Sequence, residues 1–266
     1  DAPDQAARRC GAACAGHSGT IAATLPSAAK CTVVTGVCFA RASTAASTSK
    51  PVVGTPDGAK PSDVADVVHE LAEQLDPNGK LPIGVCFPAV IVDEVAQSAA
   101  NVDKSWIGTN VGDLFEARTG RRVHVVNDAD AAGYAEVKFG AAKDVKGLVL
   151  VTTLGTGIGS ALIYNGTLIP NAELGHINLP GVKWKDAEQI AANSARVKRR
   201  LSWNRWAERL QVYYSTLERL FTPQLFVVGG GVSKEYANFL PLLELNTPII
   251  PAQHFNNAGI LGAAAL

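Results

Sequence analysis

The sequence contains no methionine, no excess charge of either sign and few aromatic side chains, at 6% of its 266 residues. Its 24 lysines and arginines balance its 24 aspartates and glutamates, so no overall field attracts nucleic acid or an anionic membrane. No apolar run has the length of a membrane span. These absences predict a cytoplasmic protein with neither nucleic-acid nor membrane partners, in which any polyanion would meet a local basic patch.

Cysteine is scarce and unevenly placed. The five cysteines are an odd number, lie mostly near the N-terminus and show no paired metal-ligand spacing, which favours a reducing compartment. The missing initiator methionine and an end within the helix-like residues 262–266 suggest a fragment or an altered terminus.

The length suffices for one large or two modest domains with a buried core. Apolar runs predict strands at residues 82–88, 123–126, 148–154 and 225–228. Ser62 and Ser202 are candidate N-caps of helices with 3.6-residue apolar periodicity. The stripe from Trp203 to Leu220 fits either core or subunit contact. In the first fifty residues, only 31–39 have strand character.

Residues 127–133, Asn-Asp-Ala-Asp-Ala-Ala-Gly, start a predicted helix directly after a strand. This pattern places Asp128 at the carboxyl end of a strand, where open α/β sheets bind ligands. The positive end of the helix favours an ionised carboxylate, so Asp128 is a candidate base. Alternatively, Asn127 or Asp128 simply caps the helix.

Glycines alternate in residues 155–159, Gly-Thr-Gly-Ile-Gly, between two strand-like runs. This predicts a hairpin whose bend lets backbone N–H groups approach phosphate, with hydroxyl donors from Thr153 and Thr156. A second cluster, Gly229, Gly230 and Gly231, follows another strand. In the sequence between these two glycine clusters, Glu173 and His176 are suited to hydrogen-bonding two adjacent hydroxyl groups. Asn165-Gly166-Thr167 matches a glycosylation acceptor but is better explained by a tight turn.

Together and in this order, these features resemble the ROK family of sugar kinases, within the actin-like ATPase superfamily. The likeness is strongest to actinobacterial polyphosphate/ATP glucokinases and covers residues 57–266. The shared phrases are residues 98–106 (Ser-Ala-Ala-Asn-Val-Asp-Lys-Ser-Trp), 127–132, 154–160, 170–176 (Pro-Asn-Ala-Glu-Leu-Gly-His) and 258–264.

The resemblance implies an α/β chain with the two-domain actin-like (ribonuclease H-like) fold, with mixed sheets and an interdomain cleft. We expect an N-terminal domain over residues 1–125 and a C-terminal domain over 126–266, with the helix after Asn256 packing back on the first. A homodimer is a further expectation. Because the sequence lacks the Cys-rich motif that many ROK proteins carry, we expect no structural zinc.

By resemblance, the sugar contacts are Asn101, Asp103, Asn127, Glu173 and His176, with Asp128 at the attacking hydroxyl. For Asn101 and Asp103 a plain Asx turn is the alternative. The predicted phosphate contacts are Thr153, Gly155, Thr156, Gly157, Gly229, Gly230 and Gly231. No residue is assigned as a metal ligand; Mg²⁺ is expected to act with the phosphoryl donor.

The cations Lys183, Lys185, Lys198, Arg199 and Arg200 lie in a mostly helical stretch. They form either a solvated helix face or a patch that tracks long polyphosphate by screened Coulomb attraction.

The resemblance fails over residues 1–50. The family's first phosphate-binding hairpin has the form Gly-Ile-Asp-x-Gly-Gly, in which the Asp helps to hold magnesium. This motif does not occur in residues 1–50. If residues 41–50 are back-translated with G/C-rich codons and read two nucleotides later, they can give Gly-Ile-Asp-Gly-Gly-Ile-Asp-Val-Lys. Our hypothesis is that this segment is a frameshifted reading of the hairpin.

Two functions remain open. The chain is either a phosphotransferase of carbohydrate metabolism and glycolysis, making glucose 6-phosphate from glucose with polyphosphate or ATP, or an impaired sugar-binding ROK protein without turnover. Mannose is a second candidate sugar. ROK repressors carry an N-terminal helix-turn-helix, for which residues 1–50 lack the apolar periodicity.

Overall fold

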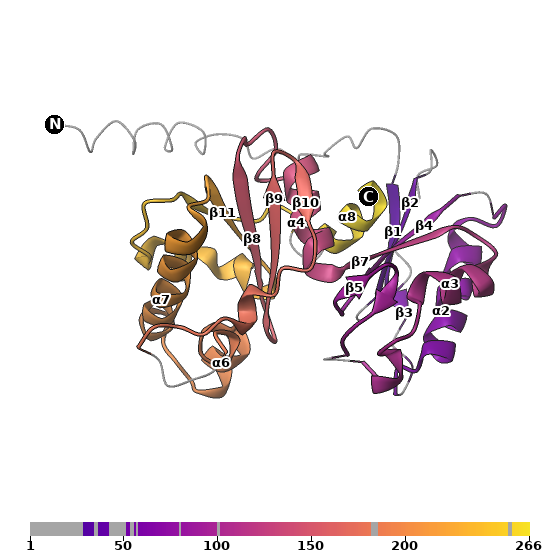
Figure 1. The fold of residues 1–266 in the computed structure, drawn as a ribbon, viewed down its shortest axis with the longest axis horizontal. Coiled ribbons are helices and arrows are strands. Elements are labelled where there is room, and N and C mark those ends of the chain that lie inside the picture. Colours follow the sequence, from indigo (N-terminus) through magenta and orange to yellow (C-terminus); the bar gives the residue numbers. More distant parts are fainter. Residues whose placement is uncertain are drawn as a thin grey trace.

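The computed structural model describes residues 29–34, 37–42, 52–53, 56, 58–79, 81–99, 102–181, 186–254 and 257–266, and only the strand assignments before residue 56. Its described part forms two lobes, each built on a mixed five-stranded sheet. Figure 1 shows the two sheets side by side, with α4 and α8 between them. The α/β fold with mixed sheets is therefore confirmed.

The first sheet has the order β3-β1-β2-β4-β7, in which β4 and β7 run parallel and β2 runs antiparallel to both β1 and β4. Its strands are β1 (Ala29–Val34), β2 (Val37–Ala42), β3 (Val52–Val53), β4 (Ile83–Phe87) and β7 (Val123–Asn127). The strand character predicted for residues 31–39 is thus confirmed, as parts of two paired strands. The hypothesis of a frameshift concerns residues 41–50, of which 41–42 end β2 and 43–50 lie outside the described residues.

The second sheet has the order β10-β9-β8-β11-β12. Its strands are β8 (Leu148–Leu154), β9 (Ile158–Tyr164), β10 (Thr167–Ile169), β11 (Leu225–Gly229) and β12 (Ile249–Pro251). The antiparallel pair β8–β9 confirms the predicted hairpin with a glycine-rich bend. Residue pairs Phe87–Asn127 and Thr153–Gly229 bring the carboxyl ends of neighbouring parallel strands together within each sheet.

Helices cover these sheets and place the remaining segments. They are α2 (Pro61–Leu75), α3 (Val111–Thr119), α4 (Asp128–Phe139), α5 (Glu188–Ala191), α6 (Asn193–Lys198), α7 (Trp203–Phe221) and α8 (Ala258–Ala265). Short elements are β5 (Ile91–Val92), β6 (Val95–Ala96), η1 (Lys104–Trp106), η2 (Leu174–His176), η3 (Gly231–Asn238) and η4 (Leu240–Leu242). Of the helices described, none combines the length and apolar character that crossing a bilayer requires.

The two helix starts were predicted with different success. Ser202 caps α7 as predicted, since its side chain accepts from the Arg205 N–H. In α2 the cap position is Lys60, and Pro61 opens the helix, so the prediction of Ser62 as N-cap is wrong. Proline suits the first helical turn because its missing N–H would have no partner there. Most of the α7 stripe is buried core, whereas Leu220 is 61% exposed.

The final helix, α8, packs on α4 and on the first sheet through glycines. A Cβ on Gly262 would lie 1.7 Å from the Ala131 carbonyl oxygen, and one on Gly84 would lie 1.9 Å from the Ala263 carbonyl oxygen. Only glycine permits this approach of backbones. The contact joins α8 to the lobe that holds β4, although the domain boundary at residues 125–126 stays a prediction.

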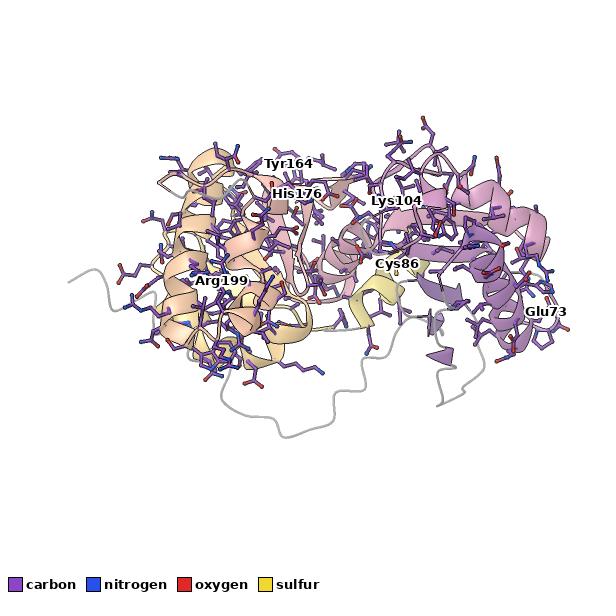
Figure 2. All side chains as sticks on the ribbon, turned by 90° about the horizontal axis from the view of Figure 1, so that it is seen from below. Glu73, Cys86, Lys104, Tyr164, His176 and Arg199 are labelled. Atoms are coloured by element: carbon purple, nitrogen blue, oxygen red, sulfur yellow. The ribbon has the colours of Figure 1, made fainter. Side chains whose placement is uncertain are left out.

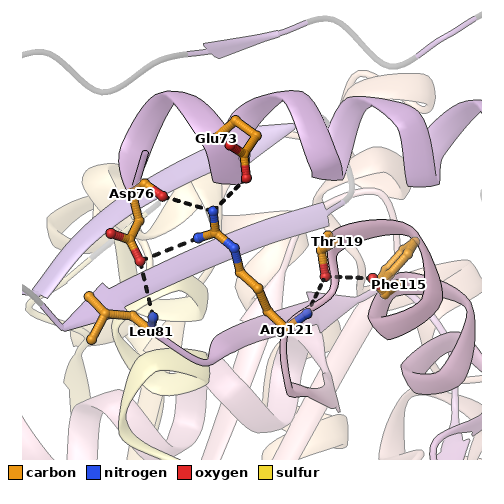
Figure 3. Close-up of polar contacts among 6 residues, drawn as sticks. All are labelled: Glu73, Asp76, Leu81, Phe115, Thr119 and Arg121. Carbon is orange, nitrogen blue, oxygen red and sulfur yellow. Dashed lines mark hydrogen bonds and ion pairs between the residues drawn. The ribbon is translucent and has the colours of Figure 1, made fainter. Parts of the chain in front are cut away.

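A buried arginine fixes the start of β7 against the end of α2 (Figure 3). Arg121 Nη2 lies 2.7 Å from Glu73 Oε1 and donates to the Asp76 carbonyl at 2.8 Å, while Nη1 lies 3.4 Å from Asp76 Oδ2. Asp76 Oδ2 also accepts from the Leu81 N–H, just before β4. Because a buried charge needs such partners, this cluster fixes the relative positions of β4 and β7, whose far ends carry the candidate site.

Candidate active site

A cavity of about 740 Å³ lies where the carboxyl ends of strands from both sheets meet. Regions that are distant in sequence line it: the loop after β4, the start of α4, the β8–β9 bend, η2, the start of α5 and the residue after β11. Its described lining residues include Pro88, Ala89, Val90, Ser98, Asn127, Asp128, Thr153, Gly155, Thr156, Gly157, Ser160, Glu173, His176, Glu188 and Gly230. The candidate base Asp128, the glycine bend and the Glu173–His176 pair therefore share one cavity.

Asn127 is the N-cap of α4. Its Oδ1 accepts from the N–H groups of Ala129 at 2.9 Å and Asp130 at 3.2 Å, and its Nδ2 donates to the Ala89 carbonyl at 2.9 Å. The capping alternative thus describes Asn127 well. Because Asn127 caps the helix, the Asp128 carboxylate is left to face the cavity, and the same side chain ties α4 to the loop after β4.

Asp128 is exposed to the cavity but surrounded by protein atoms. Withdrawal from bulk water raises its pKa above the ordinary value, and the negative charge of Glu173 adds to this, against the lowering effect of the Ala129 N–H. The shift runs opposite to our expectation that the helix terminus would favour the ionised form. A general base works best with a pKa near the working pH, so the raised pKa suits proton abstraction.

The bend from Gly155 to Gly157 is held from below by α5 and α6. The Gly155 N–H donates to the Gly157 carbonyl, and the Ser194 N–H donates to the Gly155 carbonyl, each at 3.0 Å. Ser194 Oγ donates to the Thr156 carbonyl at 2.5 Å, and Glu188 Oε2 accepts from the Ile158 N–H at 3.2 Å. A Cβ on Gly155 would meet no atom within 4 Å, which leaves room for a ligand at the bend.

Glu173 and His176 lie together at η2. Glu173 Oε2 is 3.8 Å from His176 Nε2, and both side chains are substantially exposed in the cavity. Ser160 of β9 holds this segment, because its Oγ donates to the Ala172 carbonyl and accepts from the Leu174 N–H at 2.9 Å. The pair can therefore present a carboxylate and an imidazole to adjacent hydroxyls.

Other predicted site residues lie elsewhere. Asp103 does not line this cavity; its Oδ1 accepts from Ser105 N at 2.8 Å and Ser105 Oγ at 2.5 Å, which is the geometry of the Asx alternative. Gly229 lines a smaller cavity of about 190 Å³ with Gly230, and Gly231 begins η3. Asn101, Lys183 and Lys185 lie outside the described residues.

The described cations of the patch lie at the end of α6. Lys198 and Arg200 are exposed, and Arg199 Nη2 donates to the Gln189 carbonyl at 3.2 Å. Arg209 of α7 is close enough that desolvation and then the charge of Arg199 lower its pKa. Figure 2 shows Arg199 and His176 on the same lobe. Arg199 lies farther from the other lobe than His176 does. Positive charge is therefore dense on this surface.

Comparison with known proteins decides the family. The ROK family model matches residues 38–192. The chain belongs to the ROK family. A polyphosphate glucokinase of Mycobacterium tuberculosis (strain CDC 1551 / Oshkosh) is 46% identical over 211 residues, covering 79% of this chain and 78% of the relative. One of Mycobacterium leprae (strain TN) is 44% identical over 211 residues, covering 79% and 64%.

Two solved structures share the fold of this chain. The crystal structure of an inorganic polyphosphate/ATP-glucomannokinase from Arthrobacter sp. strain KM matches with a TM-score of 0.80 and 45% identity, over 90% of this chain and 97% of that one. A Streptomyces griseus ROK glucokinase solved with glucose and AMPPNP matches with a TM-score of 0.72 and 24% identity, over 90% and 98%. The predicted resemblance and the actin-like fold are confirmed.

Our sequence reasoning missed Ser98, Ser160 and Glu188 in the lining of the cavity. Ser98 and Ser160 stand at the ends of phrases that carry the ROK resemblance, which is a usable signal. Glu188 lies in a stretch that we interpreted through its cations, and no local pattern marks it. Its place under the bend results from the tertiary packing of α5.

Proposed function

We propose that this ROK chain is a phosphotransferase that makes glucose 6-phosphate from glucose, with inorganic polyphosphate or ATP as donor. The observation that carries the proposal is the single cavity in which Asp128 faces both the glycine bend and the Glu173–His176 pair. The names of the relatives, polyphosphate glucokinase and polyphosphate/ATP-glucomannokinase, agree with it. Mannose as a second sugar, a homodimer and a cytoplasmic location are further parts of the proposal.

In the proposed reaction, the sugar 6-oxygen attacks the terminal phosphorus and Asp128 accepts the hydroxyl proton. A new oxygen–phosphorus bond forms as the bond to the rest of the donor breaks, which leaves ADP or a polyphosphate one unit shorter. Asn127, Glu173 and His176 orient the sugar, joined by Asn101 and Asp103 once the lobes close. Such closure brings substrates together and excludes water.

A divalent cation, which we propose is Mg²⁺, would act with the donor to neutralise the charge of its phosphates. Among the described residues, no three carboxylate, imidazole or thiol groups converge as a metal site. Mg²⁺ usually needs only one or two carboxylates besides phosphates and water, so the residues present are compatible with it. Of the carboxylates that line the cavity, Glu188 lies at the bend and would help to hold the cation, while Asp128 keeps the role of base.

The test is an assay of glucose 6-phosphate formation with Mg²⁺ and each donor separately, beside calorimetry of glucose binding. We expect glucose to bind and product to form with at least one donor. Glucose binding without any turnover would select the alternative, an impaired sugar-binding ROK protein. Absence of glucose binding would contradict both functions.

The cations of α6 are proposed to contact polyphosphate. We expect a Lys198→Gln, Arg199→Gln, Arg200→Gln triple variant to raise the KM for long polyphosphate about tenfold and the KM for ATP less than about twofold, because only a long polyanion meets several cations at once. Added salt should shrink the difference by screening. A matched control removes three exposed cations elsewhere, with Lys143→Gln, Lys146→Gln and Arg219→Gln. Equal losses with both donors would contradict a polyphosphate patch.

A further inference from the structure

Asn171 reaches from the second lobe to a backbone position in the first. Its Oδ1 accepts from the Ile91 N–H at 3.0 Å, and its Nδ2 donates to the Ile91 carbonyl at 2.7 Å. A side-chain amide thus satisfies both polar groups of one peptide position, as a neighbouring strand would. Asn171 also has a φ of 60°, in the left-handed region that asparagine tolerates better than most residues. Its conformation and its side chain both serve this contact.

Asp130 completes the link from inside α4. Its Oδ2 accepts from the Asn171 N–H at 2.7 Å, and the residue is only 1% exposed. Its Oδ1 is buried without a hydrogen-bond partner. Burial raises the pKa of Asp130 to about 7, opposed by the Asn171 N–H and reinforced by the charges of Glu173 and Asp128. An acidic group is therefore kept in an unfavourable environment where it can orient Asn171.

The link joins the two walls of the cavity that are proposed to face the sugar. Asn171 precedes Glu173 by two residues, so fixing its backbone restricts where Glu173 lies. On the other wall, Ile91 follows Val90, whose N–H donates to Ser98 Oγ at 3.0 Å, and Val90 and Ser98 both line the cavity. The contact between Asn171 and Ile91 is thus one residue from the lining of one wall, at Val90, and two residues from the lining of the other, at Glu173.

We propose that Asp130 and Asn171 are positioning residues that lock the η2 segment against the loop after β4 and so preform the sugar site. Neither residue needs to touch the sugar. This inference deepens the proposed function and rests on it. Preorganisation raises affinity because the ordering cost is already met before the ligand binds. Loss of the link should therefore weaken glucose binding while the two sheets stay folded.

The decisive variant is Asn171→Gly, which keeps the left-handed backbone and removes only the amide that holds Ile91. Two hydrogen bonds of ordinary net strength correspond to about a tenfold increase in the Kd for glucose, measured by calorimetry. The matched control is Asn165→Gly, because Asn165 also has a positive φ of 50° and accepts a backbone N–H, from Gly147, at 2.8 Å, but lies outside the cavity lining. We expect this control to keep the parent affinity.

A second pair of variants separates positioning from mere stability. Asp130→Ala leaves the Asn171 N–H without its acceptor and should weaken glucose binding about tenfold, whereas Asp130→Asn keeps an acceptor oxygen and should recover most of the affinity. Calorimetry is accompanied by thermal melting and by hydrogen exchange of the backbone amides of residues 88–98. The exchange of these amides should become faster in Asn171→Gly. Should Asn171→Gly not fold, the Asp130 pair carries the test alone.

Parent affinity in a folded Asn171→Gly, or equal affinities for Asp130→Ala and the parent, would overturn the proposal. The same loss in Asp130→Asn as in Asp130→Ala would also overturn it, because the acceptor would then not matter. A parent that binds no glucose would instead contradict the proposed function, so the two failures are distinguishable without any turnover.

Discussion

Replacing Asp128 by asparagine is expected to lower kcat for glucose phosphorylation about 10²–10⁴-fold, the usual contribution of a general base. The amide keeps the shape of the carboxylate and its capacity for hydrogen bonds, so glucose should still bind with a Kd within about threefold of the parent. Rapid-quench or coupled assays give kcat, and calorimetry gives Kd. A loss confined to kcat is the signature of a group that acts in the transition state.

The structure offers a matched control for this variant in α3. There Asn110 caps the helix by accepting from the Asp113 N–H at 2.9 Å, and Asp113 is an exposed carboxylate of the first turn. Asp113→Asn makes the same chemical change at a capped helix start outside the cavity and should leave kcat unchanged. An Asp128→Asn variant that turns over at the parent rate would remove Asp128 from the role of base.

Much of the fold follows from local patterns in the sequence. The bounds of β8 match the apolar run 148–154, and β11 extends the run 225–228 by one glycine. These strands are predictable because buried apolar residues are bounded by glycines and turn residues. The start of α4 is equally local, since Asn127 directly follows a strand and caps the next helix. Local chemistry therefore brings Asp128 to the edge of the first sheet.

What sequence reasoning did not reach is set by contacts between distant segments. Asn171 and Ile91 are 80 residues apart, and no local pattern pairs them. No local pattern predicts that Glu188 lies under the glycine bend either. The direction in which the pKa of Asp128 is shifted is likewise set by distant segments. A helix terminus contributes about 0.3–1 kcal/mol for an exposed charge, whereas withdrawal from water depends on how completely the tertiary structure surrounds the group. At Asp128 desolvation is the larger effect.

A second large effect is expected from restoring the phosphate hairpin, whose motif is absent from residues 41–50. Preorganised charges and N–H donors at the transferred phosphoryl group are worth on the order of 10²–10³-fold in kcat for each one removed. We therefore expect the chain as written to fall well below the roughly 1–100 per second of ordinary kinases, and a copy with a Gly-Ile-Asp-Ile-Gly-Gly hairpin in place of the Ala-Ser-Thr run to gain at least about 10²-fold. The same coupled assay with each donor measures the gain.

The control for this experiment is a copy whose inserted hairpin reads Gly-Ile-Ala-Ile-Gly-Gly. It restores the glycine backbone without the carboxylate, so it should recover only part of the rate, and the difference between the two copies isolates the group that resemblance assigns to the cation. Glucose affinity should be similar in all three proteins, because Glu173 and His176 lie on the opposite lobe and are unchanged. Since Asp128 and the glycine bend are present in the chain as written, an ordinary kinase rate without the insertion would mean that those groups suffice, and our interpretation of residues 41–50 would be wrong.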